Sequence, residues 1–198
     1  MVNTSIKPHA CCRFSCPIAD CGLELANKYN IQPDEIEDIL VKANKWMITA
    51  LCDPAERKYK PQTVVDAQFS LPYAAAVTLV KKRASVPEFT DEAIKDPIVL
   101  KVAEKVRWEF EPEFEKLYPK VYPAEVILTA RDGRKYTARV DHPKGDPENP
   151  VSDSELIDKF NLLASASVSK DKINQIIDTA MNLDKLTDIN QLTGLLRI

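Results

Sequence analysis

The sequence predicts an α+β fold in which helices pack a small sheet of about four strands, with further helices at the C-terminal end. Four short segments read as half-buried strands, from alternating apolar and polar residues or from a hairpin turn. Helical patterns with apolar stripes lie between these segments and after them. The 198 residues suffice to bury a core, as one domain or as one domain with a helical appendage.

The first predicted helix covers residues 17–30. Pro17 fits its first turn, where the missing N–H is not needed, and Ser15 or Cys16 would be the N-cap. Asn30 can take the left-handed conformation that ends many helices. The loop before this helix would point free N–H groups, together with two cations, at one position. Such a position suits an anion, with a carboxylate as the best candidate.

A strand is predicted next, over residues 35–43, because Ile39, Val41 and Ala43 fall on one face. A short apolar segment follows it, and we expect that segment to pack over the sheet. Residues 52–61 are polar and marked by prolines, which predicts a long loop. Such a loop is either functional or a solvated connector, and the sequence leaves both readings open.

The second long helical pattern runs from roughly residue 63 to residue 83. Pro72 should interrupt it, with a break at Ser70-Leu71 and a new helix that has Tyr73 in its first turn. Three alanines follow the tyrosine and allow a close approach of other groups. Two interpretations remain: Tyr73 is a site residue, or it is a buried tyrosine that is hydrogen-bonded in the core.

The remaining strands follow a pair of short helices predicted at 90–95 and 97–105. Strict alternation predicts a strand at 106–110. Residues 124–131 and 134–140 form the clearest element, since the Asp-Gly pair between them supplies the positive φ angles of a two-residue hairpin turn. The residues expected to face inward are Val126, Leu128, Tyr136, Ala138 and Val140.

Residues 141–150 contain three prolines and a glycine, so we expect a boundary there and no regular element. Three helices are predicted beyond it, at 152–164, 169–182 and 185–196. The first opens with a Ser-x-x-Glu capping box at Ser152. Their apolar stripes are wide for so short a chain, which indicates helices that dock on something larger.

Composition excludes several classes of function. The chain has 27 basic and 30 acidic side chains, which argues against nucleic acid or an anionic membrane as partner. It has no apolar run of the roughly 20 residues that span a bilayer and no signal peptide, so a cytoplasmic protein is expected. Four glycines in all make a nucleotide-cradling loop improbable, and we expect no cofactor.

Five cysteines bear on the kind of site. Cys11, Cys12, Cys16 and Cys21 are clustered, whereas Cys52 stands apart. An odd count in an unsecreted protein favours thiols over a disulfide framework. A zinc or iron–sulfur site is the alternative, but the sequence has no C-x-x-C pair. We therefore expect buried or site-lining thiols and no metal.

The candidate site residues taken from the sequence alone are Lys7, His9, Arg13 and Cys16 near one helix start and Tyr73 near another. Lysine and arginine pair with carboxylates, and arginine does so bidentately. A tyrosine, lysine or histidine can move a proton α to a carbonyl, and nearby cations stabilise the enolate-like charge that results. These residue types suit a small polyanion.

Three motifs also resemble a known family. The first is Lys-Pro-x-x-Cys-Cys-Arg-Phe-x-x-Pro-Ile-Ala-Asp at residues 7–20, the second is Thr63–Ala74 with its Phe-Ser-Leu-Pro-Tyr run, and the third is Lys-Gly-Asp-Pro-Glu-Asn-Pro-x-Ser at residues 144–152. In this order they resemble the C-terminal half of MmgE/PrpD family proteins. That family includes 2-methylcitrate dehydratase, cis-aconitate decarboxylase and iminodisuccinate epimerase.

The resemblance implies a lid domain of α+β type over residues 1–145 and a helical segment over residues 146–198 that packs on a separate all-helical domain. The active site lies in the cleft between lid and helical domain in this family. By position, Lys7 and Tyr73 match catalytic residues. Cys12 falls where the decarboxylases carry a histidine, and Cys16 where many bacterial members carry one. A thiol shuttles protons less well than imidazole near neutral pH.

The implied function is that of the lid part of an enzyme acting on a small di- or tricarboxylic acid. Proton abstraction α to a carboxylate would lead to dehydration, hydration, epimerisation or decarboxylation. The helical half is not in this sequence, which leaves two readings: a separately encoded C-terminal half with an N-terminal helical polypeptide as partner, in a homo- or hetero-oligomer, or a remnant or excised fragment. The wide apolar stripes after residue 150 favour the first, so we expect the partner. The alternative is a non-catalytic binding or assembly module with the same fold. The substrate-binding residues implied, beside catalytic Lys7 and Tyr73, are His9, Cys12, Arg13, Cys16 and Ser70.

Overall fold

The computed structural model describes residues 4–197, which fall into two compact units. The first unit ends at Pro150, and the second begins at Val151. In the described part of the chain, no helix combines the length and the apolar character needed to cross a bilayer. The α+β class predicted from the sequence is confirmed, since a four-stranded sheet stands among helices.

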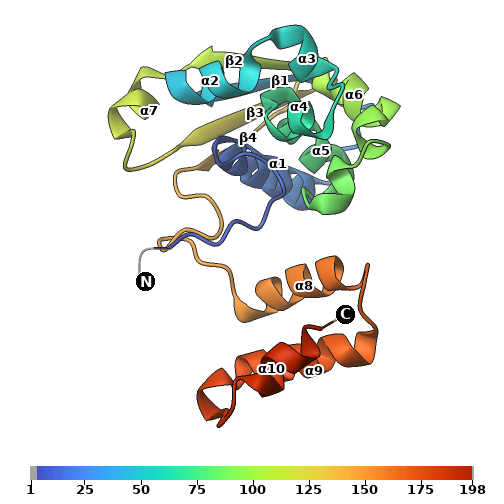
Figure 1. The fold of residues 1–198 in the computed structure, drawn as a ribbon. Coiled ribbons are helices and arrows are strands. Elements are labelled where there is room, and N and C mark those ends of the chain that lie inside the picture. Colours follow the sequence, from blue (N-terminus) through green and yellow to red (C-terminus); the bar gives the residue numbers. More distant parts are fainter. Residues whose placement is uncertain (1–3, 198) are drawn as a thin grey trace. The chain divides into compact units, whose positions relative to one another are not determined.

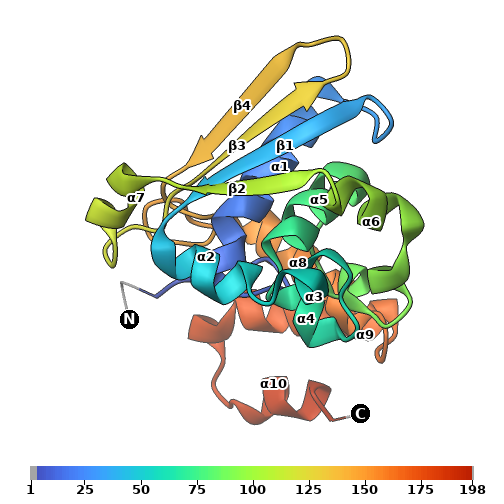
Figure 2. The same ribbon diagram turned by 90° about the horizontal axis from the view of Figure 1, so that it is seen from above.

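The sheet of the first unit has the strand order β2-β1-β3-β4 (Figures 1 and 2). The strands are β1 (Ile36–Ala43), β2 (Val106–Phe110), β3 (Ala124–Ala130) and β4 (Lys135–Val140). β1 runs parallel to β2 and antiparallel to β3, so the chain crosses over through helices between β1 and β2. The predicted hairpin of β3 and β4 is confirmed, and Gly133 takes a φ of +85° in its turn. Asp132 has no positive φ, and the backbone hydrogen bond between Ala130 and Arg134 encloses three residues, so the turn is longer than the two-residue type predicted.

One face of the sheet is buried by helices. Alternate residues of β1 and β3 are buried, including the predicted Ile39, Val41, Val126 and Leu128. The first helix, α1 (Cys16–Tyr29), packs against β3, β4 and a second helix, α5 (Leu71–Lys81). α1 ends at Asn30, which has the left-handed conformation expected of it, with φ 49°.

The close packing of α1 on α5 depends on Gly22. A Cβ atom placed at this residue would lie 2.1 Å from Oγ1 of Thr78 and 3.0 Å from its Cβ. Thr78 is itself fully buried and donates its hydroxyl to the carbonyls of Ala74 and Ala75. The two helices therefore approach each other where one has no side chain.

The predicted break in the second helical pattern is confirmed. α4 (Val64–Gln68) ends before Ser70, and α5 begins at Leu71 with Pro72 in its first turn. Ser70 caps α5, because its Oγ accepts a hydrogen bond from the backbone N–H of Tyr73 at 3.0 Å. The proline fits here, since the first turn of a helix needs no N–H from it.

Two short helices of the first unit were not predicted. α3 (Ala55–Tyr59) forms inside the expected loop 52–61, because the Ala-Glu-Arg-Lys run favours helix. α7 (Pro112–Leu117) follows β2, with Pro112 in its first turn and Glu111 as its cap. The remaining helical elements are η1 (Arg13–Ser15), α2 (Lys45–Cys52), η2 (Val86–Phe89), η3 (Ala93–Lys95) and α6 (Pro97–Ala103).

The second unit contains α8 (Asp153–Ala164), α9 (Lys170–Met181), η4 (Leu183–Lys185) and α10 (Asn190–Leu195). Ser152 and Glu155 form the predicted capping box of α8. The last predicted helix, 185–196, is shorter than expected and starts only at Asn190. Ile173 and Ile176 are the two apolar residues that become buried among those described in this unit.

Candidate active site

The chain before α1 is pinned against the end of α4. The side chain of Gln68 donates to the carbonyl of Ala10 at 2.9 Å, and the N–H of Cys12 donates to the carbonyl of Gln68 at 2.8 Å. Within this segment, Nζ of Lys7 donates a hydrogen bond to the carbonyl of Cys11 at 2.7 Å. These hydrogen bonds fix the backbone of residues 7–12, and the cation Lys7 lies at the start of this segment.

A hollow of about 280 Å³ opens beside this segment. It combines two cations, thiols, a side-chain amide and an aromatic ring. The residues that line it are Lys7, Ala10, Cys11, Cys12, Arg13, Gln68 and Phe69. The sequence predicted three of them, Lys7, Cys12 and Arg13, as site residues, and the structure brings these three together. Gln68 and Phe69 were missed as lining residues, although the second motif contains both.

Arg13 carries the second cation of the hollow, and its charge is paired. Its Nη2 lies 2.5 and 2.6 Å from the two carboxylate oxygens of Asp146. Its guanidinium also lies over the ring of Tyr122, 5.6 Å from the centroid. Burial works against the charged form, but the contacts with Asp146 prevail and raise the pKa of Arg13. Arg13 is thus a fixed cation that has a nearby counter-ion.

His9 does not line the hollow. Its Nε2 lies 2.6 Å from the carboxylate of Asp20 on α1, and its side chain is almost fully buried. The other carboxylate oxygen of Asp20 accepts the backbone N–H of Lys144 at 2.7 Å. In this structure His9 and Asp20 connect the start of the chain, α1 and the loop after β4.

The cysteines are thiols, and all five belong to the described residues. Cys12 is half-buried in the hollow, whereas Cys16 is fully buried at the start of α1 and its Sγ lies 3.5 Å from the carbonyl of Cys12. A hydrogen bond between the thiols of Cys11 and Cys16 lowers the pKa of Cys16 and raises that of Cys11. Cys16 therefore does not line the hollow, but its side chain contacts the backbone of Cys12, which does.

Tyr73 and Ser70 do not line the hollow that contains Lys7, although Ser70 directly follows Phe69, which does. The Tyr73 side chain is fully buried, and its hydroxyl donates to the carbonyl of Glu88 at 2.7 Å, with the carbonyl of Ala93 at 3.3 Å. Burial raises the pKa of Tyr73. Ser70 is also fully buried and donates to the carbonyl of Lys58 at 2.6 Å. Both hydroxyls serve the fold in this structure.

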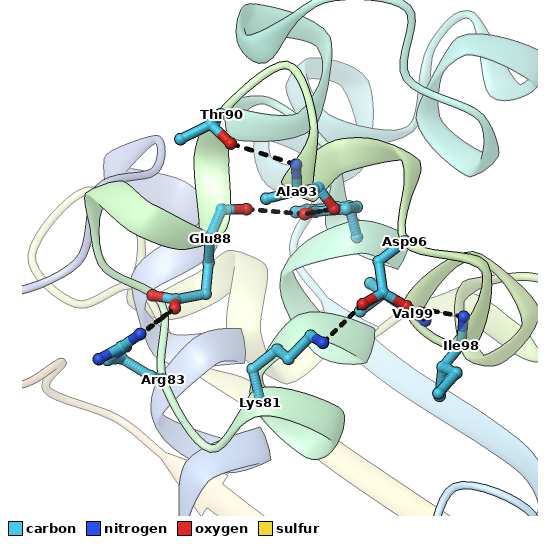
Figure 3. Close-up of polar contacts among 9 residues, drawn as sticks. Lys81, Arg83, Glu88, Thr90, Ala93, Asp96, Ile98 and Val99 are labelled. Carbon is cyan, nitrogen blue, oxygen red and sulfur yellow. Dashed lines mark hydrogen bonds and ion pairs between the residues drawn. The ribbon is translucent and has the colours of Figure 1, made fainter.

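The hydroxyl of Tyr73 borders a second hollow, of about 310 Å³, whose rim is held by two ion pairs (Figure 3). Lys81 pairs with Asp96 at 2.5 Å, and Arg83 pairs with Glu88 at 2.6 Å. In Figure 3 the carboxylate of Glu88 contacts Arg83. The backbone carbonyl of Glu88 instead accepts the hydrogen bond from the hydroxyl of Tyr73. Each cation here has its own acid, so this rim offers no excess positive charge.

One group of possible metal ligands occurs among the described residues. Single ligand atoms of His142, Asp146 and Glu148 lie within 4.8 Å of one another. However, both carboxylate oxygens of Asp146 already accept hydrogen bonds from Nη2 of Arg13. One of them also accepts a hydrogen bond from the hydroxyl of Ser5 at 2.6 Å. A guanidinium at this distance opposes a second cation, so the group reads as an ion-pair network.

Comparison with known proteins bears on the chemistry of this site. Residues 9–185 match the family model described as the MmgE/PrpD C-terminal domain. Cis-aconitate decarboxylase of Homo sapiens is 31% identical over 137 residues, which cover 69% of this chain and 28% of that protein. The enzyme of the same name from Aspergillus terreus is 30% identical over 145 residues, covering 72% of this chain and 29% of the relative. A cis-aconitate decarboxylase-like protein of Aspergillus oryzae is 26% identical over 208 residues, covering 98% of this chain and 40% of its own length.

Proposed function

The chain belongs to the MmgE/PrpD family, and from this premise we propose that it is the lid part of an enzyme acting on a small di- or tricarboxylic acid. Its relatives place it in a lyase-type enzyme family. The reaction we propose is removal of a proton α to a carboxylate, leading to dehydration, hydration, epimerisation or decarboxylation. The chain spans well under half the length of these relatives, so the whole activity is part of the proposal.

The observation that carries this proposal is the hollow shared by Lys7 and Arg13. A carboxylate is a good partner for both side chains: lysine provides a compact charge, and arginine provides directed N–H donors. Lys7 is placed by its bond to the carbonyl of Cys11, so its ammonium lies at the hollow before a ligand arrives. Preorganised cations also stabilise the negative charge that develops when a proton leaves the α carbon.

A catalytic role for Tyr73 stays a prediction. Its buried hydroxyl and its separate hollow do not support direct contact with a ligand beside Lys7. Lys7 remains the proposed catalytic residue, and Cys12 and Arg13 remain proposed contacts of the substrate.

We further propose an N-terminal helical polypeptide of the same family as partner. The second unit carries a hollow of about 290 Å³ between α8 and α9 whose walls are apolar throughout. Leu156 and Met181 on this wall are both exposed, which is costly in water. The residues lining it are Leu156, Ile157, Phe160, Ile176, Ile177, Ala180 and Met181. The unmatched remainder of the relatives supplies a natural source for a covering chain.

The test is calorimetric titration of citrate and succinate into the full chain, alone and with a family N-terminal helical polypeptide. We expect binding by the wild type and at least a tenfold loss in Lys7→Ala, because a charge-assisted contact is removed. Lys116→Ala is the matched control, since Lys116 pairs with Glu113 on α7 and does not line the hollow. Absence of binding in both settings would reject the proposal and favour the alternative, a non-catalytic assembly module. Equal losses in both lysine variants would remove the assigned site.

A further inference from the structure

We infer that Asp146 is a positioning residue of the candidate site, which holds the guanidinium of Arg13 so that its other N–H groups serve a ligand carboxylate. This inference rests on the proposed function for its ligand but not for its geometry. Asp146 lies 133 residues after Arg13, in the loop that follows β4, and only 7% of it is exposed. A carboxylate this buried needs partners, and Arg13 and Ser5 provide them.

The loop that carries Asp146 is itself built to hold one position. The N–H of Asp146 donates to the carbonyl of Pro143, and the N–H of Asn149 returns to the carbonyl of Asp146. Gly145 takes a φ of +94°, and a Cβ there would lie 1.8 Å from the carbonyl oxygen of Ile6. The N–H of Ile6 donates to the carbonyl of Gly145 at 2.8 Å. The loop is therefore tied to the segment just before Lys7.

The opposite side of Arg13 is closed by aromatic rings. The guanidinium lies 5.6 Å from the centre of the Tyr122 ring. Tyr122 is in turn held by Phe14 and Tyr118, whose ring centres lie 5.7 and 5.6 Å from its own. An acid at one edge and a ring against one face fix both the direction and the plane of the guanidinium.

The donors that remain determine what this arrangement does. Asp146 contacts Nη2 alone, whereas a guanidinium has five N–H donors on three nitrogens. Arg13 also lines the hollow with Lys7. A free arginine loses much side-chain freedom each time it binds, and a held arginine has already lost it. Asp146 lowers the net charge at the hollow, but both of its oxygens contact Nη2 of Arg13, so its charge is compensated by that guanidinium.

The first experiment needs no ligand. NMR of the arginine side chains should show restricted rotation of the Arg13 guanidinium in the wild type and its loss in Asp146→Asn. Asp132→Asn is the matched control, because it breaks another acid–arginine pair, with Arg134, away from the hollow. Unchanged rotation of Arg13 in Asp146→Asn would overturn the inference. If that variant does not fold, Tyr122→Leu takes its place. We then expect the rotation of the Arg13 guanidinium to become partly freer, and an unchanged rotation would refute the inference.

The second experiment is a double-mutant cycle on citrate affinity in the full chain with its partner. We expect Asp146→Asn to weaken binding about tenfold, the usual size for one charge-assisted contact. In the Arg13→Ala background the same change should have no further effect, because Asp146 acts through Arg13. Tighter binding by Asp146→Asn, or equal losses in both backgrounds, would overturn the inference. A wild type that binds no citrate would reject the proposed function, and the NMR result would still decide the role of Asp146.

Discussion

Tyr73→Phe separates a structural from a catalytic tyrosine. The substitution removes only the hydroxyl, which donates to the carbonyl of Glu88 at 2.7 Å in a fully buried setting. The carbonyl of Glu88 then loses its donor in a buried setting. Leaving a buried acceptor unpaired costs about 1–3 kcal/mol. We expect the free energy of unfolding of the first unit to fall by about 2 kcal/mol, or roughly 4–8 °C in melting temperature for a unit of this size.

The assay is urea unfolding followed by tryptophan fluorescence. The two tryptophans of the chain, Trp46 and Trp108, both lie in the first unit, so the signal reports that unit alone. Tyr59→Phe is the matched control, because its hydroxyl also donates to a carbonyl, that of Val106 at 2.7 Å, but from a half-buried position. Water can reach that site, so we expect a smaller loss, of about 1 kcal/mol or less.

Two outcomes for Tyr73→Phe would refute a purely structural role of the hydroxyl. If Tyr73→Phe unfolds at the wild-type urea concentration, the hydroxyl does not contribute to the fold as described. If it is as stable as the wild type but the assembled enzyme loses turnover, Tyr73 acts in the chemistry. Burial raises the pKa of Tyr73, with the charges of Asp96 and Glu88 adding to the effect. The hydroxyl therefore keeps its proton and remains a donor through the range in which these measurements are made.

Further predictions concern packing, pH and capping. Gly22→Ala should destabilise the first unit by about 1–3 kcal/mol in urea unfolding, because the new Cβ meets Thr78 at 2.1 Å, whereas Gly194→Ala, with nothing within 4 Å, should leave the stability of the second unit equal or higher. Burial raises the pKa of Cys52 from 9.0 to about 12, so the unfolded chain loses a proton above pH 9 that the folded chain keeps. Stability should then fall by about 1.4 kcal/mol per pH unit from this thiol, and Cys52→Val should remove that slope in urea titrations at pH 9.5 and 10.5. Ser152→Ala should cost the second unit about 1 kcal/mol by circular dichroism melting, since it removes the cap of α8; an unchanged midpoint would contradict this.

Several strands, a turn and a helix break could be predicted from the sequence, because each depends on residues that are adjacent in the chain. The Asp-Gly pair determined the hairpin of β3 and β4, and Pro72 determined the break before α5. Alternation predicted β1 and β2. The buried face of β1 follows the pattern of the sequence, whereas in β2 only Val106 is buried and Phe110 is exposed. The parallel pairing of β1 with β2 carries no local signal, since two strands of either orientation alternate in the same way.

At the candidate site, the structure brings together predicted residues that are neighbours in sequence and does not bring together those that are distant in sequence. Lys7, Cys12 and Arg13 lie within one short segment, so their meeting in a hollow followed from its path. Tyr73 was joined to them by the helix break at Pro72 and by its place in the second motif, and its hydroxyl donates to the carbonyl of Glu88 in this structure. The partner of Arg13 was missed, because nothing in a sequence links residue 13 to residue 146.

The pairing of Arg13 with Asp146 changes what the hollow contributes to chemistry. Arg13 and Asp146 form an ion pair, so the charge of Arg13 is balanced within the chain while Arg13 and Lys7 both line the hollow. The other side chains first expected to move protons are committed elsewhere in the described structure, since His9 pairs with Asp20 and Tyr73 serves a carbonyl. Under the proposed function the hollow binds an acid through its cations, and Lys7 remains the residue proposed to take part in proton transfer. Under the same proposal a stronger base would come from the proposed helical partner, so we expect this chain alone to bind an acid without turning it over.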